Sequence, residues 1–397
     1  MAADARGCTP IKAFLLIRVN RRLHDTLSGM MKNLLLLLAF AGLSIAAPKV
    51  EMGVINGAAF RIDIPDNWNG GLVVYCHGYN ATPVKFGDKL SPILQPFVDQ
   101  GYALAQSGYA GGGWAVEEAV VDTESLRRYF VEKYGKPKET FITGHSMGGF
   151  LTMMLMERYP TTYDAGLPMC GPLAPTDLFM ARGAFDSYVL FNYYFPGVLP
   201  EPGKIPKDFA NSRELPKKVE AALDAAPEKS AALRHFRDSN LKSNKDLAGT
   251  TAFIAYMIKE LEERAGGNPF DNRNVIYNGT LDDVKTNAEI ARYAADPGAL
   301  AYLRNFYTPT GRIQHPMLAI HTSYDPLVPV WIPNNYVTTL QNAGAENLFV
   351  QQYVNHDGHC AIQADEIAQG FAELRAWKSK GVRPRAGEVP KGTATGN

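Results

Sequence analysis

The sequence predicts an α/β protein built on a mostly parallel, doubly wound β-sheet. Short apolar runs rich in β-branched and aromatic residues predict strands at 60–64, 72–76, 102–106, 140–143, 166–169, 317–321 and 348–353. Helical patterns lie between most of these runs, as at 114–134 and 150–158, where apolar residues recur at roughly helical spacing. Strands that alternate with helices form a parallel sheet covered on both faces.

The alternation breaks between residues 172 and 314. That stretch contains the aromatic segment 188–195, a proline-rich piece near 200–206, and helical patterns near 217–236, 250–264 and 281–306. We therefore expect a helical insertion over 172–314 that divides the α/β core into residues 48–171 and 315–378. Residues 379–397 are basic and poor in large apolar groups, which predicts a flexible tail.

The amino-terminal residues 1–47 have the pattern of a leader ending in a signal peptide. Lys32 precedes the apolar run 34–43, and the small residues Ser44 and Ala46 follow it. The run is about half the roughly 20 residues that a membrane-spanning helix needs, so we expect cleavage near Ala46 or Ala47 and no membrane anchor. Residues 1–29 are either an over-extended start or a longer basic leader. The mature protein is expected to be secreted or periplasmic.

Charge and cysteine content exclude several classes of function. Lysine plus arginine total 40 and aspartate plus glutamate total 40, so no net field would attract nucleic acid. The four cysteines lack Cys-x-x-Cys spacing, and we expect no metal site. Removal of the leader would leave Cys76, Cys170 and Cys360, which permit at most one internal disulfide whose pairing stays open.

A nucleophile motif lies at Gly144-His145-Ser146-Met147-Gly148, directly between a predicted strand and a predicted helix. The serine of such a Gly-x-Ser-x-Gly elbow occupies a tight turn, and a side chain at either glycine would collide with the neighbouring strand or helix. The alternative is a phosphate-binding turn. No Gly-x-x-x-x-Gly-Lys follows, so we favour Ser146 as a nucleophile.

A serine hydroxyl needs a histidine base, and the base needs a carboxylate that orients it. Asp325 follows the predicted strand 317–321, at the carboxyl edge where sheet enzymes place catalytic groups; the alternative is a turn aspartate before proline. After the last predicted strand, either His356 or His359 could be the base. We favour His359, because Gly358 lets the loop bend back over the sheet.

The remaining histidines near these motifs have structural interpretations. His315 and His321 flank the strand at 317–321, and His145 is expected to pack under the elbow.

Two backbone N–H groups are expected to form an oxyanion hole. One belongs to Met147, the residue after the serine, and the other to Tyr79, which follows His77-Gly78 after the strand at 72–76. The glycines at 111–113 predict a flexible loop beside the pocket.

The sequence resembles the α/β-hydrolase family over about residues 58–378 outside the insertion. The resemblance rests on His77-Gly78, the Ser146 elbow, Asp325 before its proline, and Gly358-His359. The resemblance implies a doubly wound sheet of about eight strands. It also implies a Ser146, His359, Asp325 triad, no cofactor, and a helical cap between strands six and seven that shapes the substrate pocket.

The predicted reaction is hydrolysis of a small-molecule or polymer ester through an acyl-enzyme. A histidine and a methionine flank Ser146, as in many esterases and lipases of the family, whereas prolyl peptidases tend to carry an aromatic residue beside the serine. A secreted peptidase of the prolyl type is the alternative, and a non-catalytic binding protein on a hydrolase scaffold is the third hypothesis.

The aromatic segment of the insertion has two interpretations. Its rings could form the core of the cap, or they could line the acyl or alcohol pocket and favour bulky or aromatic esters. The candidate pocket residues are Tyr188, Phe191, Tyr193, Tyr194 and Phe195.

Overall fold

The structure, a computed structural model, describes residues 49–390, and one β-sheet forms the centre of the α/β core. Its strands lie in the order β1-β2-β4-β3-β5-β6-β7-β8-β9. They are β1 (Lys49–Ile55), β2 (Ala58–Ile64), β3 (Leu72–Cys76), β4 (Ala103–Ser107), β5 (Thr140–His145), β6 (Ala165–Met169), β7 (Met317–Tyr324), β8 (Phe349–Asp357) and β9 (Gly387–Glu388). β2 pairs antiparallel with β1 and β4, and the other pairs are parallel. The predicted sheet is confirmed, with nine strands in the described part of the chain.

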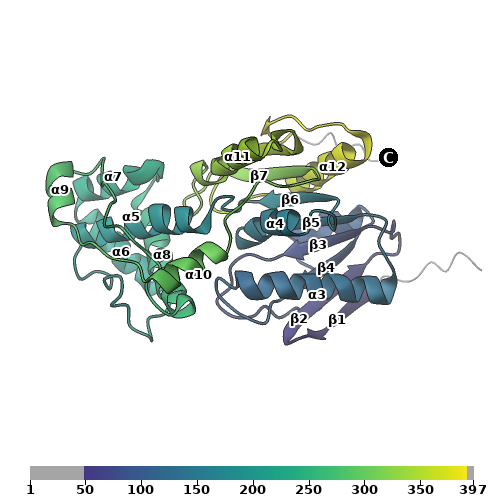
Figure 1. Ribbon diagram of the computed structural model, residues 1–397, viewed down its shortest axis with the longest axis horizontal. Helices are drawn as coiled ribbons and strands as arrows, with labels where there is room; N and C mark the ends of the chain where they lie inside the picture. Colours follow the sequence, from purple (N-terminus) through teal and green to yellow (C-terminus); the bar gives the residue numbers. More distant parts are fainter. Residues whose placement is uncertain (1–48, 391–397) are drawn as a thin grey trace, which may run out of the picture. The chain divides into compact units, whose positions relative to one another are not determined.

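Helices cover both faces of this sheet (Figure 1). α3 (Val116–Tyr134), α4 (Met147–Arg158) and α11 (Trp331–Ala343) contribute to one apolar core, and α2 (Gln95–Asp99) and α12 (Ala364–Lys380) to the other. Successive strand residues point to opposite faces, so Val74 of β3 enters the first core while Val73 and Tyr75 enter the second. Short 3₁₀ turns, η1 (Pro92–Leu94) and η4 (Glu346–Leu348), precede α2 and β8.

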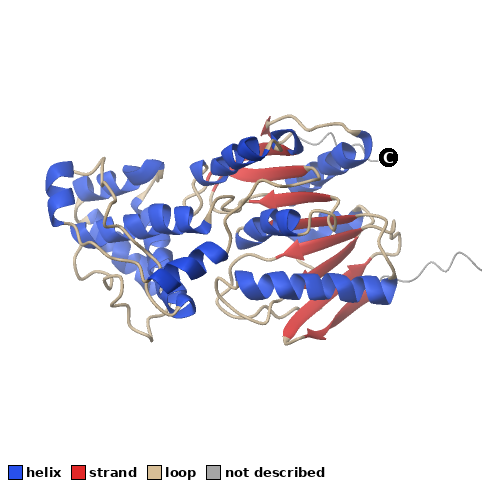
Figure 2. Cartoon of the chain, in the orientation of Figure 1, coloured by secondary structure: helices blue, strands red, loops and turns tan. Residues whose placement is uncertain are grey.

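Between β6 and β7, every named element is helical (Figure 2). We call residues 172–314 the cap. Its elements are the π-helix η2 (Leu178–Phe185), α5 (Asp186–Tyr194), α6 (Glu214–Asp224), α7 (Pro227–His235), the 3₁₀ turn η3 (Phe236–Asp238), α8 (Asn244–Ala265), α9 (Asp283–Glu289) and α10 (Pro297–Asn305).

A buried carboxylate anchors the chain where it returns from the cap to the core. Glu157 of α4 accepts hydrogen bonds from the Thr310 and Gly311 amides at 2.6 and 2.8 Å and from the Tyr336 hydroxyl of α11 at 2.7 Å. The Tyr307 hydroxyl also donates to it. These donors compensate the cost of burying a polar group, and they join α4 and α11 to the segment that precedes β7.

The expectation of a flexible tail over 379–397 is wrong for its first part. α12 continues to Lys380, and β9 pairs with β8. Val389 is buried in the second apolar core, and Arg383 donates to the Phe349 carbonyl oxygen at 2.7 Å. One buried valine and a short strand pairing hold the segment, and composition alone did not reveal either.

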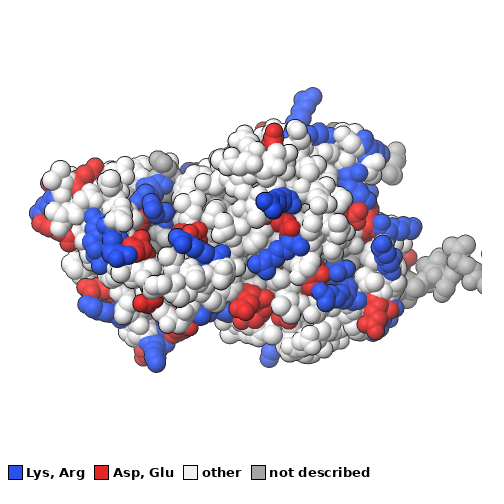
Figure 3. All heavy atoms as spheres, viewed as in Figure 1, with Lys and Arg blue, Asp and Glu red and all other residues white. Residues whose placement is uncertain are grey.

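The predicted leader and signal peptide, 1–47, and residues 391–397 lie outside the described residues. No helix in the described part is long and apolar enough to cross a membrane. On the face drawn in Figure 3, basic and acidic groups are interspersed, as expected for a chain with equal numbers of each.

Candidate active site

Ser146 lies in the turn between β5 and α4, with φ 56° and ψ −119°. A Cβ atom on Gly148 would lie 1.9 Å from the carbonyl oxygen of Cys76 in β3, and one on Gly144 would lie 2.4 Å from the same oxygen. This close approach confirms the steric reason expected for both glycines. A non-glycine residue in this region of φ and ψ is strained, and such strain concentrates at functional sites.

His359 and Asp325 complete a hydrogen-bonded chain that begins at Ser146. The distance from Ser146 Oγ to His359 Nε2 is 2.8 Å, and His359 Nδ1 lies 2.7 Å from Asp325 Oδ2. The three residues follow the carboxyl ends of β5, β8 and β7, which meet at one edge of the sheet. The structure therefore brings together all three residues predicted for the triad.

The surroundings of Asp325 favour its ionised form. Burial alone would raise its pKa, but the hydrogen bond and charge of His359, the charge of His321 and the amide of Val328 lower the pKa below its usual range. Asp325 Oδ1 accepts from the amides of Leu327 and Val328 at 2.9 and 2.8 Å. Because a carboxylate only accepts, His359 Nδ1 carries the hydrogen and Nε2 can accept the Ser146 proton.

Three other histidines near these motifs each have a polar contact outside the triad. The distance from Nε2 of His356, the alternative base, to Oε1 of Glu366 is 2.9 Å. His321 Nε2 is 2.9 Å from the Val328 carbonyl oxygen, and His145 Nδ1 is 3.1 Å from the Tyr75 hydroxyl.

A disulfide joins Cys170, the residue after β6, to Cys360, the residue after His359. Cys76 is buried and has a free thiol. The bond ties the loop that carries His359 to the sheet edge next to the elbow. The sequence left this pairing open, although the adjacency of Cys360 to His359 was a signal that could have indicated it.

The loop after β3 is held by the cap. Gly78, Tyr79 and Ser146 share the wall of one pocket. The Tyr79 hydroxyl donates to Glu260 Oε2 of α8 at 2.8 Å, and its ring makes an edge contact with Phe253 of the same helix. Burial, and then the charge of Glu260, raise the pKa of Tyr79, so the phenol keeps its proton. Glu260 lies 181 residues from Tyr79, and no local pattern indicated this contact.

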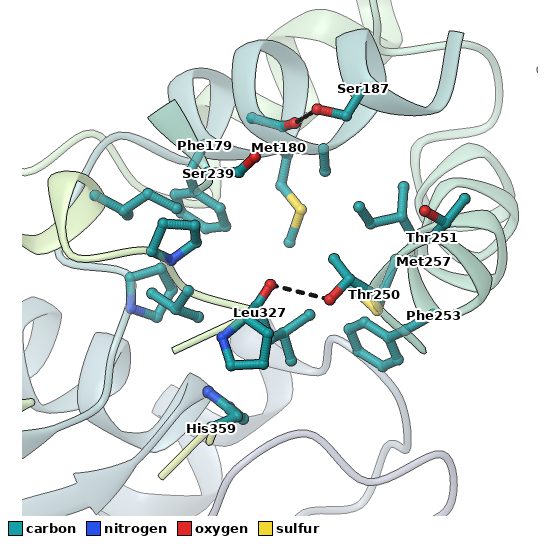
Figure 4. Close-up of a pocket in the computed structure, with 18 of the residues that line it drawn as sticks. Phe179, Met180, Ser187, Ser239, Thr250, Thr251, Phe253, Met257, Leu327 and His359 are labelled. Carbon is teal, nitrogen blue, oxygen red and sulfur yellow. Dashed lines mark hydrogen bonds between the residues drawn. The ribbon is translucent and has the colours of Figure 1, made fainter. Parts of the chain in front are cut away.

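The pocket above Ser146 has a volume of about 320 Å³ and is lined by core and cap residues. In Figure 4, Ser187 and Ser239 lie on the side of the pocket opposite His359. Thr250 Oγ1 of α8 donates to the Pro326 carbonyl oxygen at 2.9 Å, which joins the cap to the loop after β7. Large apolar groups in its wall include Trp114, Phe179, Met180, Phe236, Phe253, Met257 and Trp331.

The five aromatic residues proposed for the pocket do not line it. Tyr188 and Phe191 are fully buried in the cap, and the Tyr188 hydroxyl donates to the Pro200 carbonyl oxygen at 2.6 Å. Phe195 stacks on Phe191, Tyr194 accepts from the Leu281 amide, and Tyr193 donates to Glu289. The interpretation as pocket residues is wrong, because α5 directs these rings into the core of the cap or onto its surface.

Of the residues that line the pocket, Ser146, Tyr79 and His359 were predicted as site residues. Most of the others could not be predicted because they come from distant segments, such as η2, η3, α8 and the loop after β7. Among the described residues, no cluster of three or more His, Cys, Asp or Glu side chains is arranged to hold a metal ion.

Residues 73–372 match the alpha/beta hydrolase family, and the chain belongs to that family. This membership, together with the fold, supports a hydrolase. No curated protein matches the sequence.

Solved structures are similar to this chain at low sequence identity. An esterase from Aspergillus oryzae is 12% identical with a TM-score of 0.50, and the match covers 84% of this chain and 80% of that one. A point mutant of the rice cell wall degrading esterase LipA from Xanthomonas oryzae is 16% identical, with a TM-score of 0.40 and coverage of 82% and 84%. Pyrococcus horikoshii acylaminoacyl peptidase is 12% identical with a TM-score of 0.43. The match covers 81% of this chain but only 39% of the peptidase.

Proposed function

We propose that this protein is a secreted serine hydrolase that cleaves carboxylic esters through an acyl-enzyme. The observation that carries the proposal is the hydrogen-bonded chain from Ser146 Oγ through His359 to the buried Asp325. A hydroxyl, an imidazole and a carboxylate in this order are the groups that acyl transfer needs.

In the first half of the reaction, Ser146 Oγ attacks the ester carbonyl carbon while its proton passes to His359 Nε2. Asp325 holds the resulting imidazolium in place. The amides of Met147 and Tyr79 donate to the oxyanion; the Met147 amide is at the first position of α4, where an N–H has no intrahelical acceptor. The carbon–oxygen bond to the alcohol then breaks, and His359 returns the proton to the leaving alcohol.

In the second half, water attacks the acyl carbon and gives a proton to His359. The tetrahedral intermediate collapses, the bond to Ser146 breaks, and Ser146 Oγ regains its proton. The carboxylic acid leaves, so every proton that His359 takes up is released within one cycle.

The pocket wall supports a bulky hydrophobic or aromatic ester as substrate. Phe179, Phe236, Phe253 and Trp331 supply rings that can contact an apolar acyl or alcohol group. These residues replace the aromatic segment of α5 as the basis for this preference.

Secretion is supported by the pattern of residues 1–47 and by the disulfide between Cys170 and Cys360. Disulfides persist in secreted and periplasmic proteins and are rare where thiols are kept reduced.

A fluorophosphonate probe tests the serine mechanism directly. It should label the wild-type protein at Ser146 and leave Ser146→Ala unlabelled. A panel of aryl esters and aminoacyl-proline amides, assayed with the same protein, then identifies the bond that is cleaved.

Faster cleavage of the proline amides than of the esters would replace the esterase with a prolyl peptidase. Labelling at no residue, together with no turnover of either substrate class, would favour a binding protein.

A further inference from the structure

The pocket wall contains two buried hydrogen-bond donors that have no acceptor among the described residues, Arg237 Nε and Trp114 Nε1. The two serines on the cap side of the wall already use their protons. Ser187 donates to the Gly183 carbonyl oxygen at 2.7 Å, and Ser239 donates to the carbonyl oxygens of Arg234 and Phe236 at 2.9 and 2.8 Å. A ligand that satisfies the pocket must therefore bring acceptor atoms.

Arg237 is the charged member of this pair, and its ion pair uses only part of the guanidinium. Its Nη2 lies 2.9 Å from Oδ2 of Asp186, a residue that is 1% exposed. A bidentate pair would also engage Nε, but Nε is left without a partner among the described groups.

The charges that act most strongly on Asp186 are positive. The strongest charges that act on Asp186 are those of Arg237, Arg182 and Arg292, all of which are arginines. The apolar wall of the pocket strengthens any charge interaction within it.

The backbone at Arg237 is held in an unfavourable conformation. Its φ of 56° and ψ of 39° interrupt η3 in the left-handed region, which residues other than glycine adopt at a free-energy cost. The conformation sets Arg237 in the pocket wall beside Phe236, whose side chain is buried in the apolar core. Strain of this kind concentrates at functional sites.

We propose that Arg237 binds a carboxylate of the substrate, so that the preferred ester carries an acid group at the end remote from the bond that is cleaved. The apolar middle of such a molecule would contact Phe179, Phe253 and Met257 while its ester group lies at Ser146. The assignment rests on the proposed serine esterase activity and names the substrate class of that site.

Matched substrates test the assignment. One pair is 4-nitrophenyl hydrogen adipate and 4-nitrophenyl hexanoate, which differ in the terminal carboxylate, and a second pair carries the carboxylate on the alcohol side. The wild type should prefer the acid member of at least one pair by roughly 10- to 100-fold in kcat/KM, as expected for a hydrogen bond to a charged group. Arg237→Gln should bring that ratio close to one, and Arg237→Lys should keep part of the preference.

Asp186→Asn is the matched control, because it breaks the same ion pair from the other side. Recognition by Arg237 predicts that Asp186→Asn keeps the preference for the acid ester. The compared quantity is the kcat/KM of the acid ester divided by that of its neutral partner. Equal values in Arg237→Gln and Asp186→Asn, or a wild-type value near one in both substrate pairs, would overturn the assignment and leave the ion pair a structural role.

Binding to Ser146→Ala separates this assignment from the esterase proposal. Calorimetry with 4-phenylbutyrate should show binding that is lost in Ser146→Ala/Arg237→Gln and kept in Ser146→Ala/Asp186→Asn. Binding with this pattern but no ester turnover in the wild type would contradict the esterase and retain the acid site. Turnover of esters without such binding, and without a preference in kcat/KM for the acid ester, would contradict the acid site and retain the esterase.

Discussion

Single residues at the carboxyl edge of the sheet carry the proposed chemistry, and their surroundings set their protonation. Asp325 is 2% exposed, yet it stays ionised because two amides and His359 donate to it. The ionised carboxylate keeps the hydrogen of His359 on Nδ1, so Nε2 is the nitrogen that faces Ser146. His356 lies in β8, three residues before His359, and its side chain contacts Glu366 instead.

Replacing Ser146, His359 or Asp325 by alanine should lower kcat by on the order of 10³-fold or more in each case, because the three act as a unit. Steady-state kinetics with an aryl ester measure the loss. His356→Ala is the matched control and should keep near-normal turnover. Normal activity in His359→Ala combined with loss of activity in His356→Ala would show that His356, and not His359, is the base. Circular dichroism should show that the variants keep their fold.

His145 makes folding sensitive to acid. Burial, and then the charge of His359, lower its pKa from 6.5 to about 4. Between these values the unfolded chain binds a proton that the folded chain does not, so stability falls as pH falls. From pH 7 to pH 5 this group should contribute a loss of about 2 kcal/mol. Urea unfolding of the wild type and of His145→Asn at both pH values measures it.

The wild type should lose more stability than His145→Asn over this interval. An equal loss in both proteins would show that His145 does not titrate as its burial requires.

At the scale of elements, α8 of the cap acts on the loop after β3. Glu260 accepts from the Tyr79 hydroxyl and from the Trp114 amide, and Arg264 one turn later bonds to Glu260 and Glu118. The backbone N–H proposed for the oxyanion therefore belongs to a residue whose side chain is held by the cap. The cap thus contributes to the geometry of the loop as well as to the pocket wall.

Tyr79→Phe should lower kcat by about 10-fold with little change in KM. The amide remains, but its loop loses an anchor, so the effect should be smaller than the 10²- to 10³-fold that follows removal of an oxyanion donor. Tyr193→Phe is a matched control, since it deletes the hydroxyl of a tyrosine–glutamate pair outside the pocket. Equal kcat values in the two variants would mean that the Glu260 contact does not position the loop.

At the scale of the whole molecule, one covalent bond joins the two parts of the α/β core across the cap. Cys170 precedes the cap, Cys360 follows it, and the two residues are 190 positions apart in the sequence. The bond closes a long loop and fixes the residue next to His359. It therefore links the stability of the chain to the position of the proposed base.

The double variant Cys170→Ala/Cys360→Ala should unfold with a free energy lower by about 2–5 kcal/mol, because loss of the cross-link frees the unfolded chain. Denaturant titration measures this change. Its kcat should also fall, since the His359 loop loses its anchor. A thiol reductant should reduce the activity of the wild type and leave the variant unaffected. Full activity of the variant would show that hydrogen bonds alone position His359.

Much of the fold could be predicted from the sequence because its elements are local. Buried strands appear as short apolar runs, and helices appear as apolar residues at helical spacing. The strands β2 to β8 and the helices α3 and α4 were therefore expected near their observed bounds. β1 was missed because it is an antiparallel edge strand whose apolar residues Val50, Met52 and Val54 are exposed. β9 was missed because it is only two residues long.

The sequence by itself determined the elbow at Ser146 and the choice of Asp325 and His359, because each sits in a short motif at the end of a predicted strand. Only the tertiary structure decided the pocket, the pairing of Cys170 with Cys360, the contact of Glu260 with Tyr79 and the place of the aromatic rings of α5. These features depend on which distant segments meet when the cap packs on the core. Two segments can meet in this way without any local pattern, because packing is satisfied by shape and apolar area rather than by a specific motif.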